Sequence, residues 1–217
     1  MSKAALKPLV LVTAIIAIIV SVLAVALTPQ TKPPQSIAID TSEKPTLGEP
    51  SAPIHIVAFE DLKCSDCKAY NNTLFPIIKK KYIDTGIAKY TMAVVAFIPG
   101  SIPAANAALC LYHQNDAFYF PFVEYVYQNQ PPEDQNWATI PTLLKFAKAS
   151  VPNANLQDLS NCIFTDTYSN TIQNNFKLGM KLMNNQLATP TLYVNGVIVR
   201  PLTMKHLDEL ITAARKK

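Results

Sequence analysis

The sequence has little glycine, little net charge and few candidate metal ligands, and each shortage argues against one fold class, one kind of partner or one kind of site. It holds 5 glycines against 17 prolines, which favours helices joined by stiff connections over an all-β barrel. The formal net charge is +4, and Lys3 and Lys7 at the N-terminus carry two of those charges, so we expect no nucleic-acid partner. The histidines are isolated and there is a single C-x-x-C pair, so we expect no metal and no cofactor.

One long apolar run stands near the N-terminus. Residues 9–27 contain no charge, glycine or proline, and their length is close to the ~20 residues with which a helix crosses a bilayer. Lys3 and Lys7 precede the run, so the amino end is expected in the cytoplasm. Ala24-Val25-Ala26 also fits a cleavage site, so residues 1–27 are a signal peptide or an uncleaved membrane anchor. Under either alternative we expect the rest of the chain to be exported to the periplasm.

The exported part begins with a proline-rich stretch and carries all four cysteines. Residues 28–46 hold little apolar material, which predicts a semi-stiff tether, and from about Leu47 the chain is expected to dock on a domain. An even number of cysteines in an oxidising compartment suggests pairing. The cysteines are Cys64, Cys67, Cys110 and Cys162.

Beyond the tether, strand patterns give way to helical ones and then return. The first strand is expected over 54–59, bounded by Glu60-Asp61, and a helix that Pro76 kinks starts at Cys64. The later elements are a strand over 88–98, helices over 102–113, 117–128, 137–149, 156–164, 168–184 and 204–215, and a hairpin of 191–194 and 197–200 around Asn195-Gly196. We therefore expect an α/β domain over 47–98 and 176–217, interrupted by a helical insertion over 99–175.

The segment Cys64-Ser65-Asp66-Cys67 follows the first strand and opens a helix, which suits disulfide exchange. The free N–H groups and positive dipole end of a helix stabilise a thiolate, and Cys67 lies one turn later on the same face. We expect Cys64 to be exposed and to attack, and Cys67 to be buried and to resolve the mixed disulfide. Half of a zinc site and an inert structural disulfide are the alternatives.

Ser65 and Asp66 are expected to tune the pKa of the pair. Asp66 places a negative charge beside both sulfurs, which disfavours the thiolate of Cys64 and predicts a weaker oxidant. Lys63 and Lys68 flank the pair and partly offset that charge.

Thr189-Pro190 stands immediately before the predicted strand 191–194. Proline is sterically tolerated at the first residue of a strand, which is the ordinary explanation for it. Placed after a C-x-x-C pair and before a hairpin, the dipeptide resembles the cis-proline of thioredoxin-fold proteins, which implies a loop that faces the cysteines and leaves a backbone edge free for a substrate strand.

Two further pairs of residues admit more than one interpretation. Glu60 and Asp61 are a proton relay near Cys67 or simply the end of the strand. Cys110 and Cys162 lie in the predicted helical insertion without local C-x-x-C spacing. They form a structural disulfide, remain free buried thiols, or act as a second redox pair.

The stretch 48–68 resembles the start of DsbA-like thioredoxin-fold proteins, with G-x-P-x-A-P, an apolar strand and F-x-D-x-x-C-x-x-C. The alanine-rich segment 104–110 resembles the first helix of that family's inserted helical domain, and ATPTLYVNG resembles its cis-proline strand. The resemblance covers about residues 46–215. It implies a thioredoxin fold with an inserted helical domain and a thiol–disulfide oxidoreductase. By it, Cys64 attacks, Cys67 resolves, and Pro190 is the cis-proline with Thr189 before it.

The dipeptide Ser65-Asp66 departs from the Pro-His of strongly oxidising members, which implies a milder or more reducing, DsbH-type member. Only the short tether precedes the fold where disulfide isomerases carry a dimerisation domain, so we expect a monomer. The expected partners are protein thiols and disulfides, a membrane or periplasmic redox partner, and the membrane if residues 9–27 stay uncleaved. The alternative from another class is a non-enzymatic, membrane-tethered thioredoxin-like module that binds a partner at the Pro190 edge.

Overall fold

The computed structural model describes residues 35–216 of the chain. The predicted signal peptide or anchor over 1–27 and the first part of the tether lie outside the described residues. Among the residues that are described, no helix is both long enough and apolar enough to cross a membrane.

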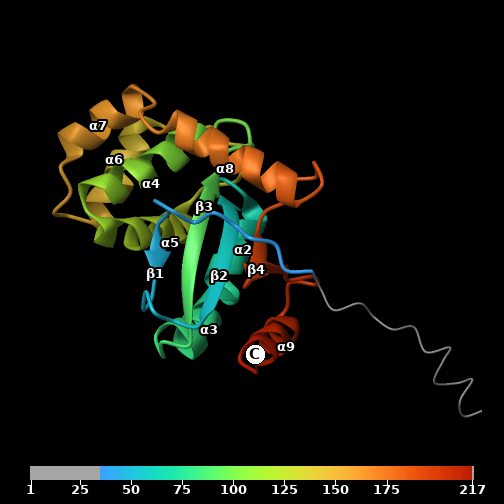
Figure 1. Ribbon diagram of the computed structural model, residues 1–217. Coiled ribbons are helices and arrows are strands. Elements are labelled where there is room, and N and C mark those ends of the chain that lie inside the picture. The colour runs from blue at the N-terminus through green and yellow to red at the C-terminus, as the bar shows by residue number, and fades with distance from the viewer. Residues whose placement is uncertain (1–34, 217) are drawn as a thin grey trace, which may run out of the picture. The chain divides into compact units, whose positions relative to one another are not determined.

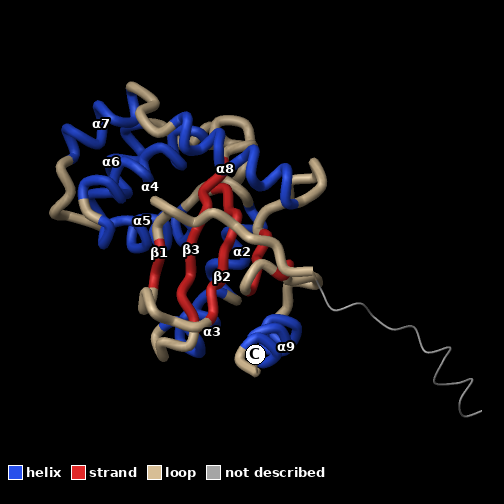
Figure 2. Tube along the Cα trace, in the orientation of Figure 1, coloured by secondary structure: helices blue, strands red, loops and turns tan. Residues whose placement is uncertain are grey.

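A five-stranded mixed sheet lies at the centre of the described chain (Figures 1 and 2). Strands β2 and β3 run parallel, and every other neighbouring pair is antiparallel. The spatial order is β1 (Thr46–Leu47), β3 (Ala88–Val95), β2 (Ile54–Asp61), β4 (Thr191–Val194) and β5 (Val197–Ile198). β2 is therefore the middle strand, and its nearly continuous apolar run suits a strand buried on both faces.

The side chains of β2 alternate between two hydrophobic clusters, because successive strand residues point to opposite faces. Ile56 and Ala58 pack with helices α2 (Ser65–Thr73) and α9 (Met204–Ala214). Val57 and Phe59 pack instead with α8 (Ser169–Leu182). Figure 1 shows α8 near one end of the sheet and α9 near the other. This arrangement confirms the predicted α/β class.

The acidic pair at the end of β2 lies inside the strand. β2 pairs with β3 as far as Asp61, which lies opposite Val95, and both Glu60 and Asp61 are fully buried. The prediction that these two residues bound the strand is therefore wrong. Their carboxyl groups find hydrogen-bond donors in the interior, which compensates the cost of burying them.

Pro76 begins a new helix instead of kinking the first one. α2 ends at Thr73, and Pro76 stands in the first turn of α3 (Phe75–Ile78), which a π-helical turn, η1 (Lys79–Ile83), follows. The N–H groups in the first turn of a helix have no acceptor within that helix, so proline costs no hydrogen bond there. The first helix therefore ends before Pro76 and a second one begins.

Between β3 and β4 the chain is helical. The elements are α4 (Ile102–Gln114), the 3-10 turn η2 (Asp116–Phe118), α5 (Tyr119–Asn129), α6 (Ile140–Ser150), α7 (Leu156–Phe164) and then α8. The helix predicted from 137 begins at Ile140, because Pro141 occupies its first turn. The boundary predicted after residue 175 falls inside α8.

The described part of the tether docks earlier than Leu47. The backbone N–H of Ile37 donates to the carbonyl oxygen of Gly196 at 2.9 Å, and that of Met92 donates to Pro45 at 3.0 Å. A Cβ atom on Gly196 would lie 2.0 Å from the carbonyl oxygen of Ile37, and its φ is +79°. The turn between β4 and β5 therefore requires glycine for close approach as well as for its conformation.

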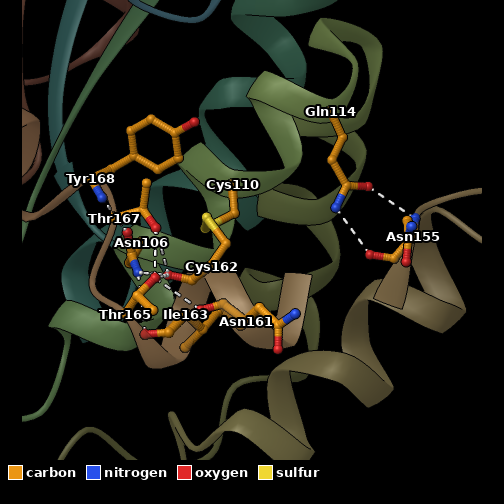
Figure 3. The surroundings of a disulfide bond; sticks show 10 residues. All are labelled: Asn106, Cys110, Gln114, Asn155, Asn161, Cys162, Ile163, Thr165, Thr167 and Tyr168. Carbon is orange, nitrogen blue, oxygen red and sulfur yellow. Dashed lines mark hydrogen bonds between the residues drawn. A yellow bond between two sulfur atoms is a disulfide. The ribbon is translucent and has the colours of Figure 1, made fainter. Parts of the chain in front are cut away.

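A disulfide joins Cys110 on α4 to Cys162 on α7 (Figure 3). Beside it, the side chain of Asn106 donates to the carbonyl oxygen of Cys162 and accepts from the backbone N–H of Tyr168, both at 2.9 Å. The disulfide and Asn106 together connect α4, α7 and the residue that precedes α8.

We predict that removing the disulfide destabilises the folded chain. The two cysteines are 52 residues apart, and closing a loop of that length lowers the entropy of the unfolded chain. The double variant Cys110→Ala/Cys162→Ala is expected to lose about 4 kcal/mol of unfolding free energy, measured by denaturant titration. The exposed substitution Thr167→Ser, in the same region, is the control. A loss of less than about 1 kcal/mol would contradict the prediction.

Candidate active site

Cys64 lies where the central strand passes into the helix α2. It is the N-cap residue of α2, its N–H donates to the carbonyl oxygen of Asp61, and its own carbonyl oxygen accepts from Lys68. Its side chain is 6 % exposed, so it is more enclosed than predicted, although it retains an opening to solvent. The loop before β4 covers it, since the Cys64 Sγ atom donates to the carbonyl oxygen of Thr189 at 3.5 Å.

The surroundings of Cys64 favour its thiolate. Its pKa falls to about 6, first because the thiol of Cys67 donates to its sulfur, and then through Thr189 and the backbone amides of Cys67 and Asp66. Burial opposes this change but does not cancel it. A thiol with such a pKa is largely ionised at neutral pH, which is the form that attacks disulfides.

Cys67 has the opposite character. It has no exposed surface, and burial raises its pKa well above the ordinary value, with the hydrogen bond to Cys64 and the charge of Glu60 acting in the same direction. The two cysteines of one helical turn thus differ: one is ionisable and reachable, and the other is protonated and sealed.

Thr189 and Pro190 lie in the loop that meets Cys64. The Thr189–Pro190 peptide bond is cis, and the next residue, Thr191, opens β4 opposite Phe59 of the central strand. Pairing of β4 with β2 brings the loop to the end of the sheet from which Cys64 emerges. A second cis bond, Arg200–Pro201, was not predicted from the sequence.

Glu60 lies fully buried on the α2 side of the sheet. Its carboxyl group accepts hydrogen bonds from the hydroxyl of Tyr90 and the side-chain amide of Asn71. Burial raises its pKa to about 7, against the opposing effect of hydrogen bonds from Tyr90, Asn71 and Tyr127. A carboxyl group with this pKa changes its protonation near neutral pH, and its negative charge raises the pKa of the Cys67 thiol.

Asp61 holds the backbone around the cysteines. One carboxylate oxygen accepts from the N–H of Lys63, and the other accepts from the N–H groups of Phe97 and Ile98 and the hydroxyl of Ser101, all at 2.9–3.0 Å. Burial raises the pKa of Asp61. These bonds fasten the segment after β3 to the residue that precedes Cys64, a role that no local sequence pattern reveals.

The flanking residues of the pair behave differently from expectation. Ser65 and Asp66 are exposed, as befits the outer side of the first helical turn. Lys63 donates through Nζ to the carbonyl oxygen of Pro99, and Lys68 donates to that of Gln130. Both ammonium groups are thus engaged with backbone carbonyls, and within residues 35–216 neither forms an ion pair with Asp66.

The structure gathers six of the eight candidate residues at one place. Cys64, Ser65, Asp66 and Cys67 meet the loop of Thr189 and Pro190, whereas Cys110 and Cys162 bond to each other within the helical insertion. Among the described residues, no group of three or more histidine, cysteine or acidic side chains is placed to hold a metal ion.

A buried strand that leads into a helix capped by Cys64, with a second cysteine one turn later and a proline loop beside it, defines a thiol–disulfide oxidoreductase of the thioredoxin type. A family model described as Thioredoxin matches residues 40–213. The chain therefore belongs to the thioredoxin family, and within it to the DsbA-like thiol–disulfide oxidoreductases.

Two kinds of relative support this placement. Disulfide bond formation protein D of Bacillus subtilis (strain 168) is 32% identical over 158 residues, which cover 72% of this chain and 70% of that protein. The crystal structure of Chlamydia trachomatis DsbA is 33% identical, with a TM-score of 0.75 over 85% of this chain and 98% of that chain. Oxidised BdbD from Bacillus subtilis is 30% identical, with a TM-score of 0.78 over 86% of this chain and 100% of that chain. The predicted thioredoxin fold and oxidoreductase class are thereby confirmed.

We predict that Glu60 makes the stability of the chain depend on pH. Its pKa is about 7 in the folded chain and 4.5 when unperturbed, so between these values the folded state keeps a proton that the unfolded state has lost. The unfolding free energy should therefore fall as the pH rises through this window, by up to about 3 kcal/mol. Denaturant titrations from about pH 4 to about pH 8 measure the fall.

The variant Glu60→Gln should remove this part of the pH dependence, because an amide does not titrate. Glu49→Gln, at an exposed site, is the matched control and should keep the wild-type slope. Equal slopes in the wild type and Glu60→Gln would contradict the assignment of the raised pKa to Glu60.

Proposed function

We propose that this chain exchanges disulfides with protein substrates through Cys64 and Cys67, with Cys64 as the attacking residue. The observation that carries the proposal is the opposition between the two sulfurs: the pKa of Cys64 is lowered to about 6, whereas that of the sealed Cys67 is raised. An ionised, reachable sulfur is a good nucleophile and a good leaving group, so exchange with a substrate takes place at Cys64.

The exchange proceeds in two displacements. In the oxidising direction, a substrate thiolate attacks Cys64 of the Cys64–Cys67 disulfide, and Cys67 leaves with the electron pair of the broken bond. A second substrate thiolate then attacks the substrate sulfur of the mixed disulfide and releases the Cys64 thiolate. The substrate gains a disulfide, and the pair accepts two electrons; the reducing direction reverses each step.

Glu60 is proposed to supply the proton that the buried Cys67 needs when it leaves. A thiolate sealed from water at Cys67 is costly, and Glu60 holds a proton up to a pH of about 7. In the reverse direction the Glu60 carboxylate accepts the Cys67 proton. A proton relay is one of the two interpretations of Glu60 given by the sequence. The burial of Glu60 and the effect of its charge on the pKa of Cys67 support it.

The loop of Thr189 and Pro190 is proposed to receive the substrate backbone. The carbonyl oxygen of Thr189 already accepts from the Cys64 thiol, so it lies beside the sulfur that a mixed disulfide would occupy. Once that thiol is consumed, the same oxygen is available to a backbone N–H of an extended substrate.

We propose that the pair is a milder oxidant than the strongest members of its family, in the direction of a DsbH-type protein. Strongly oxidising DsbA has a cysteine pKa of roughly 3.5 and thioredoxin roughly 7, and the pKa of Cys64 of about 6 is nearer to the second. The exposed Asp66 beside the pair supports the same direction.

We also propose that the chain works in the periplasm, attached through residues 9–27 or released after cleavage. The apolar run supports export, and the Cys110–Cys162 disulfide suits an oxidising compartment. A membrane or periplasmic redox partner would then reset the pair, and the chain would act as a monomer.

We predict that disulfide exchange depends on both cysteines in different ways. Wild type should accelerate the reduction of insulin by a dithiol, Cys64→Ser should reduce the rate to background, and Cys67→Ser should accumulate a mixed disulfide with the substrate. Thr73→Ser, exposed on the same helix, should keep the wild-type rate. Activity that persists in Cys64→Ser would contradict the role of Cys64, and a wild type that gives no acceleration would favour the alternative of a non-enzymatic binding module.

We predict that the reduction potential of the pair is more negative than that of a strong oxidant. Equilibration with glutathione should give a value below about −180 mV, on the thioredoxin side of the range from roughly −270 to roughly −120 mV. A value near −120 mV would show a strong oxidant and contradict the proposed poise.

A further inference from the structure

The N-terminus of α2 carries a carboxylate as well as a sulfur. The first four amides of a helix, counted from its N-cap, have no partner within it, and in α2 they belong to Cys64, Ser65, Asp66 and Cys67. The Cys64 amide donates to the carbonyl oxygen of Asp61, and those of Asp66 and Cys67 favour the anionic sulfur of Cys64. The remaining amide, that of Ser65, donates to the Oε2 atom of Glu133 at 2.8 Å.

Glu133 comes from a segment that is fastened to the active site. It lies between α5 and α6 in the helical insertion, 68 residues from Ser65. In the same segment, Gln130 is 3 % exposed, donates through Nε2 to the carbonyl oxygen of Lys63 at 3.0 Å and accepts from Lys68 at 2.9 Å. These bonds dock the segment on both sides of the cysteine pair and bring the Glu133 carboxylate to the helix end.

A second negative charge at that helix end works against the thiolate. The positive end of a helix stabilises nearby anions, and two anions there repel one another. Lys63 and Lys68 donate to backbone carbonyls, and no salt bridge of Glu133 exists within residues 35–216. The strand, the helix and the docked segment bring titratable or charged residues to the start of α2: Glu60, Asp61, Lys63, Asp66, Lys68, Glu133 and Asp134.

We propose that Glu133 is a positioning residue that sets the redox poise of the Cys64–Cys67 pair by sharing the N-terminus of α2 with the Cys64 sulfur. This inference rests on the proposed role of Cys64 and deepens it. Reduction of the pair by two glutathione thiols yields a dithiol whose stability depends on the Cys64 thiolate, together with one glutathione disulfide. By disfavouring that thiolate, Glu133 shifts the equilibrium toward the protein disulfide and makes the pair a weaker oxidant.

The test compares Glu133→Gln with wild type in the full-length chain. The amide keeps the length of the side chain and an acceptor oxygen, but it removes the charge. The far-ultraviolet absorbance of the thiolate should show the Cys64 titration midpoint falling by about half a pH unit. The equilibrium constant with glutathione should shift about threefold toward the dithiol. The NMR signal of the Ser65 N–H should also move, because its acceptor changes from a carboxylate to an amide.

The matched control is Asp134→Asn, which removes the same charge from the next residue of the segment. Asp134 is exposed and lines the same hollow of about 490 Å³, together with Ser65 and Glu133. It has no recorded hydrogen bond to α2, so its substitution should leave both the midpoint and the equilibrium constant unchanged. If Asp134→Asn shifted the Cys64 titration midpoint as much as Glu133→Gln does, the effect would come from surface charge in general, and the inference would be overturned.

Two further outcomes separate this inference from the proposed function. The first outcome is a thiolate absorbance step in the wild-type titration that vanishes in Cys64→Ser but keeps its midpoint in Glu133→Gln; it overturns the role of Glu133 alone. If the wild-type titration shows no thiolate step, the proposed role of Cys64 fails and the inference fails with it. Thermal unfolding of each variant is measured in parallel to check that it folds. If Glu133→Gln does not fold, Glu133→Asp replaces it. The shorter aspartate keeps the negative charge but moves it away from the Ser65 amide, so the Cys64 titration midpoint should also fall.

Discussion

The constraint on which this protein depends is the short passage from a buried central strand to the open end of a helix. Only Leu62, Lys63 and Cys64 separate the end of β2 from the start of α2. Since β2 is buried on both faces, the start of α2 lies at the rim of the interior, and its unpaired amides are directed at the residue that joins the two elements. One placement therefore produces an ionisable sulfur that keeps a small opening to solvent and a fully buried sulfur one turn later.

The two acidic residues at the end of β2, Glu60 and Asp61, have different surroundings in the site. Adjacent strand residues face opposite sides of the sheet, so Glu60 and Asp61 meet different donors. Asp61 meets backbone N–H groups and the hydroxyl of Ser101, which fix the loops around it. Glu60 meets a phenol and a side-chain amide below α2, and burial there leaves it able to change protonation near neutral pH. A carboxyl group therefore fixes the backbone on one face and changes its protonation near neutral pH on the other.

The helical insertion takes part in the chemistry as well as covering the sheet. Two segments contact the residues around the cysteine pair: the residues after β3 bind Asp61 and Lys63, and the segment between α5 and α6, in the middle of the insertion, binds Lys63, Ser65 and Lys68. A change within the insertion can therefore alter the ionisation of Cys64 without touching the sequence between the cysteines. The lysines that flank the pair illustrate the point, because their ammonium groups donate to carbonyl oxygens of these segments.

The sequence by itself determined four of the five strands, most of the helices, the hairpin at Asn195-Gly196 and the pairing of C-x-x-C with a helix start, because each follows from residues within a few positions of one another; the short strand β1 was not predicted. Its errors were local ones that packing decided: the strand continues through two acids that find donors inside, and Pro76 begins a helix rather than bending one. Only the tertiary structure decided how enclosed Cys64 is, what surrounds Glu60, and that Glu133 reaches Ser65. Those contacts join residues far apart along the chain, and their energies depend on burial and orientation, which no short stretch of sequence specifies.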